Sequence, residues 1–137
     1  MDILGCQYPI VKTPRGLLPT VYQTAAVKAD LMQLLLTNPG ERVMLPEFGT
    51  PLRELLFEPS NPLFAQRVRN AIIGAINLWE PRVVVLAIDV VDPQGNTGDA
   101  AILTNSDSNS FYVNIKFALP EKLQAVDQLT LEIPLGE

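Results

Sequence analysis

The stretch that decides the fold covers residues 72–91 and reads IIGAINLWEPRVVVLAIDVV. Before Pro81, the apolar side chains recur every three or four residues, as on one face of an α-helix. Pro81 cannot continue a helix, and the residues that follow are mostly apolar and β-branched, as in a buried β-strand. Because both faces of 83–91 are apolar, we expect this strand to be covered on both sides. The stretch therefore predicts helices before Pro81 and a sheet after it.

Upstream of this change, the sequence predicts three helices. The first would begin at Thr20, a suitable N-cap, and end at Asn38-Pro39-Gly40, since proline removes a donor and glycine accepts a positive φ. A short second helix would start at Thr50-Pro51, and a third would start at Asn61-Pro62. The side chains predicted to face the core are Val27, Leu31, Leu34 and Leu35 in the first helix, and Phe64, Val68, Ala71, Ile72, Ala75, Ile76 and Trp79 in the third.

Downstream, two segments alternate strictly between apolar and polar residues, which is typical of strands with one buried face. Pro134 cannot donate to a ladder, so the last strand is expected at an edge. We therefore predict an α+β fold, in which the helices are followed by a small, mostly antiparallel sheet with a C-terminal edge hairpin. The inward-facing side chains would be Phe111, Val113, Ile115, Phe117 and Leu119, and then Leu129, Leu131, Ile133 and Leu135.

The first 19 residues differ from the rest of the chain. Pro9, Pro14 and Pro19 predict an extended N-terminal arm, residues 1–19, without regular structure. A chain of 137 residues that is 47% hydrophobic can build one core. We expect a single domain at 20–137, with its helices in 20–80 and its sheet in 82–135.

The composition excludes several classes of function. The chain has no histidine and one cysteine, Cys6, which removes His-dependent catalysis and His-ligated zinc. Its net charge is -5 and no dense basic patch occurs, so nucleic acid is not an expected partner. No apolar run approaches the ~20 residues of a membrane helix, and no signal peptide pattern opens the chain. We expect no cofactor, no metal and no membrane partner.

Three stretches together resemble a known family. Residues 38–44 hold a Gly-Glu-Arg element, residues 46–59 hold Pro-Glu-Phe-Gly-Thr-Pro, and residues 79–83 hold a Glu-Pro-Arg triplet between an amphipathic helix and a Val-rich strand. In this combination, the chain resembles the small baseplate wedge family of contractile phage tails. Members are often labelled lysozyme-like and also occur in type VI secretion and related injection systems. The resemblance covers about residues 20–135 and does not include the arm.

The resemblance implies a structural, non-enzymatic part of the tail baseplate in a virion made in the host cytoplasm. Its Glu-Pro-Arg region would bind other wedge proteins near the tube. Its C-terminal strands would template the first sheath ring by pairing with the tail sheath subunit. Tube or hub proteins are further candidate partners. The residues expected to bind partners are Glu80, Pro81, Arg82, Glu41, Arg42, Leu129, Leu131, Glu132 and Ile133.

Each of these interpretations has an alternative. Pro81 could simply end a helix between two solvated charges. However, a carboxylate at a helix C-terminus meets the negative end of the dipole, so Glu80 favours a nearby cation from Arg82, another part of the fold or a partner. The last strand could equally be covered within the fold.

A second class of function is a carboxylate-based peptidoglycan hydrolase of the tail. A glycosidase needs two carboxyl groups, one of them protonated. The neighbouring Arg42 and Arg53 favour ionised carboxylates instead, so we expect no enzyme. The crowded carboxylates in question are Glu41, Glu47, Glu54 and Glu58.

Overall fold

The computed structural model describes residues 4–56, 63–91, 110–120 and 125–134. Expectations that concern Glu58, Asn61-Pro62 and Leu135 lie outside these residues. The elements in chain order are β1 (Leu4–Cys6), β2 (Thr20–Tyr22), α1 (Thr24–Leu36), α2 (Leu52–Leu56), α3 (Phe64–Trp79), β3 (Val84–Val91), β4 (Ser110–Ala118) and β5 (Asp127–Pro134).

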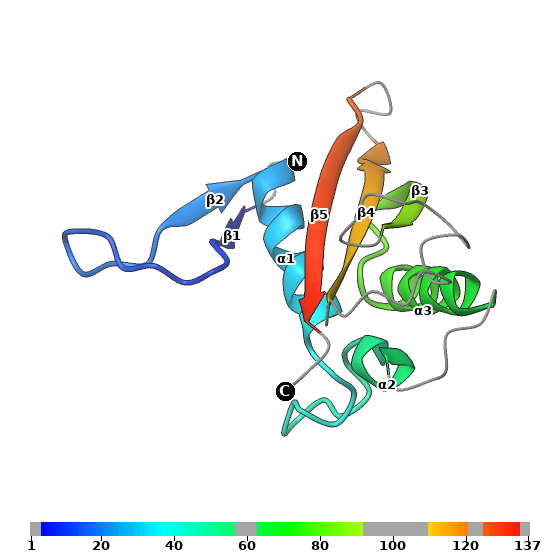
Figure 1. Ribbon diagram of the computed structural model, residues 1–137. Helices are drawn as coiled ribbons and strands as arrows, with labels where there is room; N and C mark the ends of the chain where they lie inside the picture. Colours follow the sequence, from blue (N-terminus) through cyan, green and yellow to red (C-terminus); the bar gives the residue numbers. More distant parts are fainter. Residues whose placement is uncertain (1–3, 57–62, 92–109, 121–124, 135–137) are drawn as a thin grey trace.

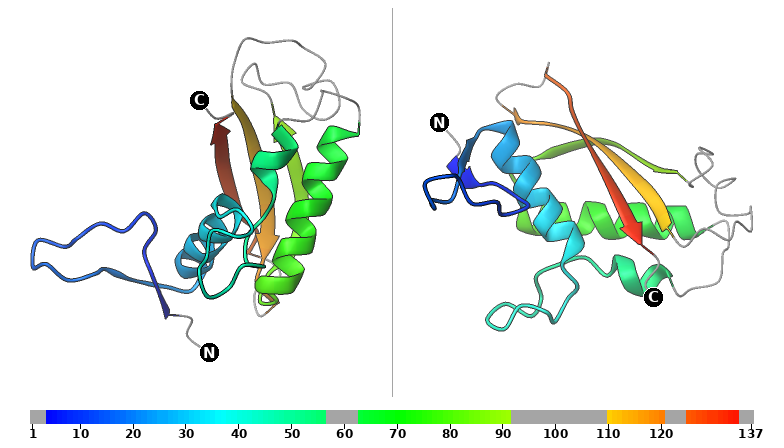
Figure 2. Two further views of the ribbon diagram at one scale, coloured as in Figure 1. Left: turned by 90° about the horizontal axis from the view of Figure 1, so that it is seen from below. Right: turned by 60° about the vertical axis from the view of Figure 1, so that its left-hand side comes forward.

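The main sheet has the strand order β3-β4-β5, and both pairs are antiparallel. The helices lie on one face of this sheet, as the two views of Figure 2 show. The α+β fold class is therefore confirmed, and β5 lies at an edge of the sheet formed by the described strands, as predicted. The alternation in β4 and β5 is also confirmed, because the predicted inward side chains of both strands are buried through Ile133.

The core lies between the inner face of the sheet and the stripes of α1 and α3. All four residues predicted for the α1 stripe are buried, and Ile72 and Ile76 of α3 are fully buried. The rings of Phe64 and Phe111 meet edge to face at 5.8 Å, which joins α3 to the central strand. Full burial of a large aliphatic side chain contributes about 1.5–3 kcal/mol, so these stripes hold the layers together.

The N-terminal prediction is wrong in two respects: residues 1–19 contain a strand, β1, and the first helix does not begin at Thr20. Residues 20–22 do not begin a helix but form β2, which pairs with β1 in the register Gly5↔Val21. The β-branched residues of Thr20-Val21-Tyr22 suit a strand better than a helix start. The helix begins only at Thr24, after Gln23 adopts a φ of 50°. The proline-rich residues thus form the loop of a hairpin that projects from the body of the molecule (Figure 1).

The prediction that 83–91 is covered on both sides is also wrong. Among the described strands, β3 lies at an edge of the sheet, and Val84 and Leu86 are 39% and 50% exposed. Its pairing with β4 is interrupted between Val85 and Ala87. An apolar run alone does not reveal the number of layers around a strand, and among the described elements all helices pack on the same face of the sheet.

Candidate interaction site

The Glu-Pro-Arg triplet forms a tight connection between α3 and β3. The Glu80 N–H donates to the Ile76 carbonyl at 2.8 Å, which closes the last turn of α3. The Val83 N–H then donates to the Glu80 carbonyl at 3.1 Å, so the chain turns around Pro81. This geometry directs the Glu80 side chain into the protein, where the residue is only 7% exposed.

Arg82 provides the cation that Glu80 needs. Its Nε and Nη2 donate to the two carboxylate oxygens of Glu80, at 2.5 and 2.7 Å. Nη2 also donates to Asp30 of α1 at 2.9 Å. The hydrogen bonds to Glu80 raise the pKa of Arg82 above its already high value, so the guanidinium stays charged. The Glu80–Arg82–Asp30 cluster therefore links α1, the end of α3 and the start of β3.

Part of this cluster remains available to another molecule. The side chains of Arg82 and Asp30 are 45% and 40% exposed. The Nη1 group of Arg82 has no hydrogen bond to any part of the chain that the structure describes. Arginine can therefore donate further hydrogen bonds to a partner while it holds Glu80 in place.

The loop between α1 and α2 places Arg42 next to this cluster. The Thr50 N–H donates to the Thr37 carbonyl at 2.9 Å and closes the base of the loop. Within the loop, the Arg42 guanidinium lies 4.0 Å from the centre of the Phe48 ring. That ring meets Trp79 at 5.3 Å and 66°. The result is a continuous stack from Arg42 to the last residue of α3.

A shallow cavity of about 200 Å³ lies between the stack and the ion cluster. It brings together two residues that the sequence predicted to bind partners, Glu80 and Arg42. Of the two stack residues, Trp79 was predicted only as a core residue, and Phe48 lies in the Pro-Glu-Phe-Gly-Thr-Pro motif. The lining residues are Asp30, Gln33, Leu34, Arg42, Phe48, Trp79 and Glu80.

Glu41 shapes the loop. Its two carboxylate oxygens accept hydrogen bonds from the Asn38 backbone N–H at 2.9 Å and from Asn38 Nδ2 at 3.0 Å. These bonds lower the pKa of the Glu41 carboxyl. A lowered pKa is the opposite of what the acid of a glycosidase requires. Glu41, one of the four carboxylates named for the hydrolase alternative, therefore does not support it.

The four C-terminal candidates are separated by the two faces of β5. Leu129, Leu131 and Ile133 are buried against the helices, whereas Glu132 is exposed on the other face. Their side chains therefore cannot bind one partner together. A partner could reach them jointly only along the backbone edge of β5, as the strand-pairing prediction supposes.

Two features were missed at the level of the sequence. Asp30 lies outside the predicted core stripe of the first helix, and nothing in its neighbourhood indicated a pairing with Arg82, which is 52 residues away. Val43 and Met44 are 94% and 92% exposed at the tip of the loop. The turn signals Pro39-Gly40 and Pro46 around them could have indicated a projecting tip.

Within the described ranges, no group of three or more Cys, Asp or Glu side chains could hold a metal ion. In the same ranges, no helix is both long and apolar enough to cross a membrane.

Comparison with known proteins matches residues 22–120 to the profile of a family described as "Baseplate wedge protein gp25". The chain is 29% identical over 108 residues to baseplate wedge protein gp25 of Enterobacteria phage T4, with 79% of this chain and 73% of that protein covered. It is 28% identical over 69 residues to baseplate protein W of Escherichia phage P2, with 50% and 60% covered.

Solved structures show the same fold. A crystal structure of a putative tail lysozyme from Geobacter sulfurreducens superimposes with a TM-score of 0.64 at 23% identity, covering 81% of this chain and 89% of that one. A subunit of the anti-feeding prophage baseplate gives 0.64 at 15% identity, with 99% and 88% covered. A subunit of the postcontracted pyocin R2 baseplate gives 0.55 at 22% identity, with 98% and 100% covered.

The fold is thus one that occurs in the baseplates of contractile tails. The profile match covers well over half of the sequence, and the chain belongs to the baseplate wedge protein gp25 family. The resemblance that the three motifs indicated is confirmed. The protein is a baseplate wedge component of a contractile tail system, and its phage relatives are parts of virion tails.

Proposed function

We propose that this protein joins wedge proteins near the tail tube and starts the sheath by offering the free edge of β5 to an extended segment of a sheath subunit. The observation that supports this proposal best is that the outer edge of β5 is unpaired among the described strands. Among the described strands, β5 pairs only with β4, along its eight residues. Its sequence, DQLTLEIP, has no lysine and no proline before its last residue. An edge that lacks such protection can accept another strand.

The opposite edge of the sheet, β3, is better protected against the addition of another strand. The irregular pairing between Val85 and Ala87 distorts β3, as bulges do on edges that must not pair. In addition, Arg69 of α3 donates from Nε to the Ile88 carbonyl at 3.1 Å, so a backbone acceptor of β3 is already engaged by a side chain. The contrast between the two edges favours β5 as the strand that accepts a partner.

For the joining of wedge proteins, the ion cluster is the best candidate. Arg82 is fixed by two carboxylates and still has free donors at the surface. Its neighbours Arg42 and Phe48 form a stacked wall beside the cavity. A preorganised arginine next to an aromatic surface is typical of residues that contribute strongly to protein interfaces.

Sheath initiation can be tested with a self-complemented variant. A short turn and a strand of alternating Thr and Val would be added after the C-terminus, so that the new strand can fold back onto the free edge of β5. We expect the variant to enter baseplates normally, because the ion cluster is unchanged. Such baseplates should fail to nucleate sheath when purified sheath subunits are added, as counted by electron microscopy.

The matched control carries the same turn followed by a Gly-Ser tail of equal length, which cannot form a strand. Baseplates with this control should nucleate sheath as the wild-type protein does. Normal sheath on baseplates with the self-complemented variant, together with amide protection showing that the added strand is paired, would contradict the proposal.

The joining role can be tested by co-expression with wedge proteins of the same tail. Arg82→Ala should abolish the co-purified complex. Because this change also leaves Glu80 buried without its cation, Arg82→Lys is the second variant: it keeps a positive charge but loses the planar fork. We expect Arg82→Lys to fold and to bind the wedge proteins more weakly. Arg53→Ala, which removes an exposed arginine on α2, is the control and should bind normally.

Light-scattering mass and a thermal melt would be recorded for every variant. A folded Arg82→Lys variant that forms the complex with wild-type affinity would rule out a role of the arginine fork in joining wedge proteins.

A further inference from the structure

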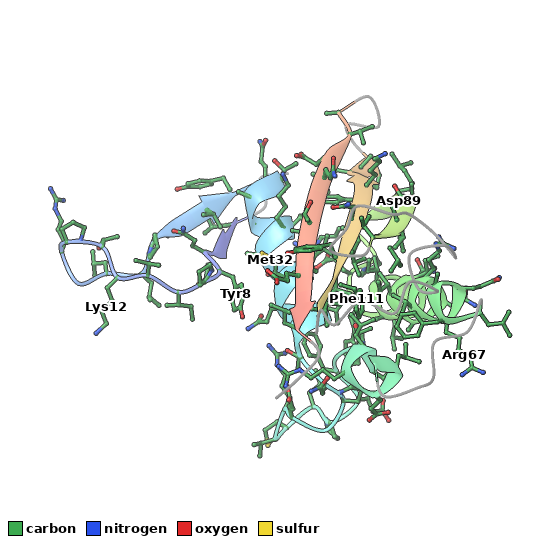
Figure 3. The ribbon with its side chains drawn as sticks, in the orientation of Figure 1. Tyr8, Lys12, Met32, Arg67, Asp89 and Phe111 are labelled. Atoms are coloured by element: carbon green, nitrogen blue, oxygen red, sulfur yellow. The ribbon has the colours of Figure 1, made fainter. Side chains whose placement is uncertain are left out.

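The free edge of β5 is bordered by α1, so an incoming strand would lie against this helix. α1 packs beside β5, and Lys28 Nζ lies 2.7 Å from Asp127 Oδ1 at the first residue of the strand. Met32 and Leu36 follow Lys28 at intervals of four residues, so the three side chains share one side of the helix. Figure 3 shows Met32 where α1 passes beside β5.

The side of α1 that borders β5 is apolar after Lys28. Met32 and Leu36 are only partly buried and pack against the core formed by residues such as Leu131. In a strand added next to β5, side chains that point toward the helices would lie against these two residues. Such positions favour apolar side chains, because covering Met32 and Leu36 removes further apolar surface from water.

The outer side of β5 carries a single free charge within the described residues. Gln128, Thr130 and Glu132 alternate with the buried leucines and isoleucine and therefore lie on the open face. Thr130 Oγ1 donates to Asn114 Oδ1 at 2.7 Å and is thus engaged. Glu132 is exposed, and no hydrogen bond or ion pair links it to the described part of the chain.

We propose that the segment which adds to β5 is an alternating strand with apolar side chains toward Met32 and Leu36 and a lysine or arginine opposite Glu132. This inference depends on the proposed strand addition and specifies the chemistry of the partner. Because the other charge of β5, Asp127, is occupied by Lys28, Glu132 alone sets the charge preference and the register. Cross-strand pairs of opposite charge contribute enough to change an affinity about two- to fivefold.

The test uses the full-length protein and capped synthetic peptides as long as β5, in which Val and Thr alternate. One peptide has a lysine in its outward row, and a second has a glutamate at the same position. The position is scanned along the row to find the residue opposite Glu132. Isothermal titration calorimetry at low ionic strength measures the affinities for the wild-type protein and for Glu132→Lys. Glu54→Lys, an equal charge change on α2, is the control.

We expect the lysine peptide to bind the wild-type protein about two- to fivefold more tightly than the glutamate peptide. Glu132→Lys should reverse this order, and Glu54→Lys should leave it unchanged. Equal binding of both peptides to the wild-type protein would overturn the charge preference and leave strand addition intact. If no peptide binds any variant, both the charge preference and strand addition at β5 are wrong.

Discussion

At the level of single residues, the electrostatics of a helix end were enough to predict that a cation lies near Glu80. A carboxylate at the end of a helix is unfavourable unless a cation is close, and this argument correctly indicated a nearby cation with Arg82 among the candidates. The bidentate pair in the structure provides that cation. The third member, Asp30, could not be predicted, because its approach depends on how α1 crosses the end of α3.

Gly49 is the residue whose replacement tests the loop most directly. Its φ is 127°, and an added Cβ would lie 2.4 Å from the Thr37 carbonyl oxygen. Gly49→Ala should therefore lower the free energy of unfolding by about 1–3 kcal/mol or more, since both the backbone and the close contact resist it. Urea denaturation would measure the change.

Gly74 is the matched control, because it lies in α3 with nothing within 4 Å of its Cβ position. Gly74→Ala should raise the free energy of unfolding by up to about 1 kcal/mol. If Gly49→Ala were as stable as the wild-type protein, the close approach of Gly49 to Thr37 would be refuted.

At the level of elements, periodicity predicted what depends on one repeating pattern. The alternation from Phe111 to Phe117 fixed which face of β4 is buried, and the stripe around Ile72 fixed the inner side of α3. Two errors arose where a short segment had to be assigned without such a pattern. Residues 20–22 became a strand because β1 was available to pair with them. Strand 84–91 is apolar on both faces, yet the described helices cover only one.

The corrected position of β3 leads to a prediction for two of its residues. Leu86 is 50% exposed, so Leu86→Lys should change the free energy of unfolding by less than about 1 kcal/mol. Val90 is 1% exposed, and Val90→Lys would bury an unpaired charge in the core. We expect the second variant to unfold at a much lower urea concentration or to fail to fold. Similar large losses for both variants would show that the open face of β3 is covered.

At the level of the whole molecule, the order of helices and sheet could be predicted from the change at Pro81, but the assembly of the candidate site could not. The cavity beside Glu80 is built from α1, the 38–50 loop and the end of α3. The end of α3 is distant in the sequence from α1 and the loop that follows it, and only their packing brings Arg42, Asp30 and Trp79 together. The motifs that carried the family resemblance indicated the right regions without showing that they meet.

The place of β5 at the rim of the sheet also determines how the protein would respond to mechanical load. The hydrogen bonds of an antiparallel pair run perpendicular to the strands. A pull along the axis of β5 would therefore shear its whole ladder with β4 at once, and the bonds would share the force. A pull away from the sheet would peel them one pair at a time. In a structure that contracts along its length, the β4–β5 ladder would therefore resist the load best when the force runs parallel to β5.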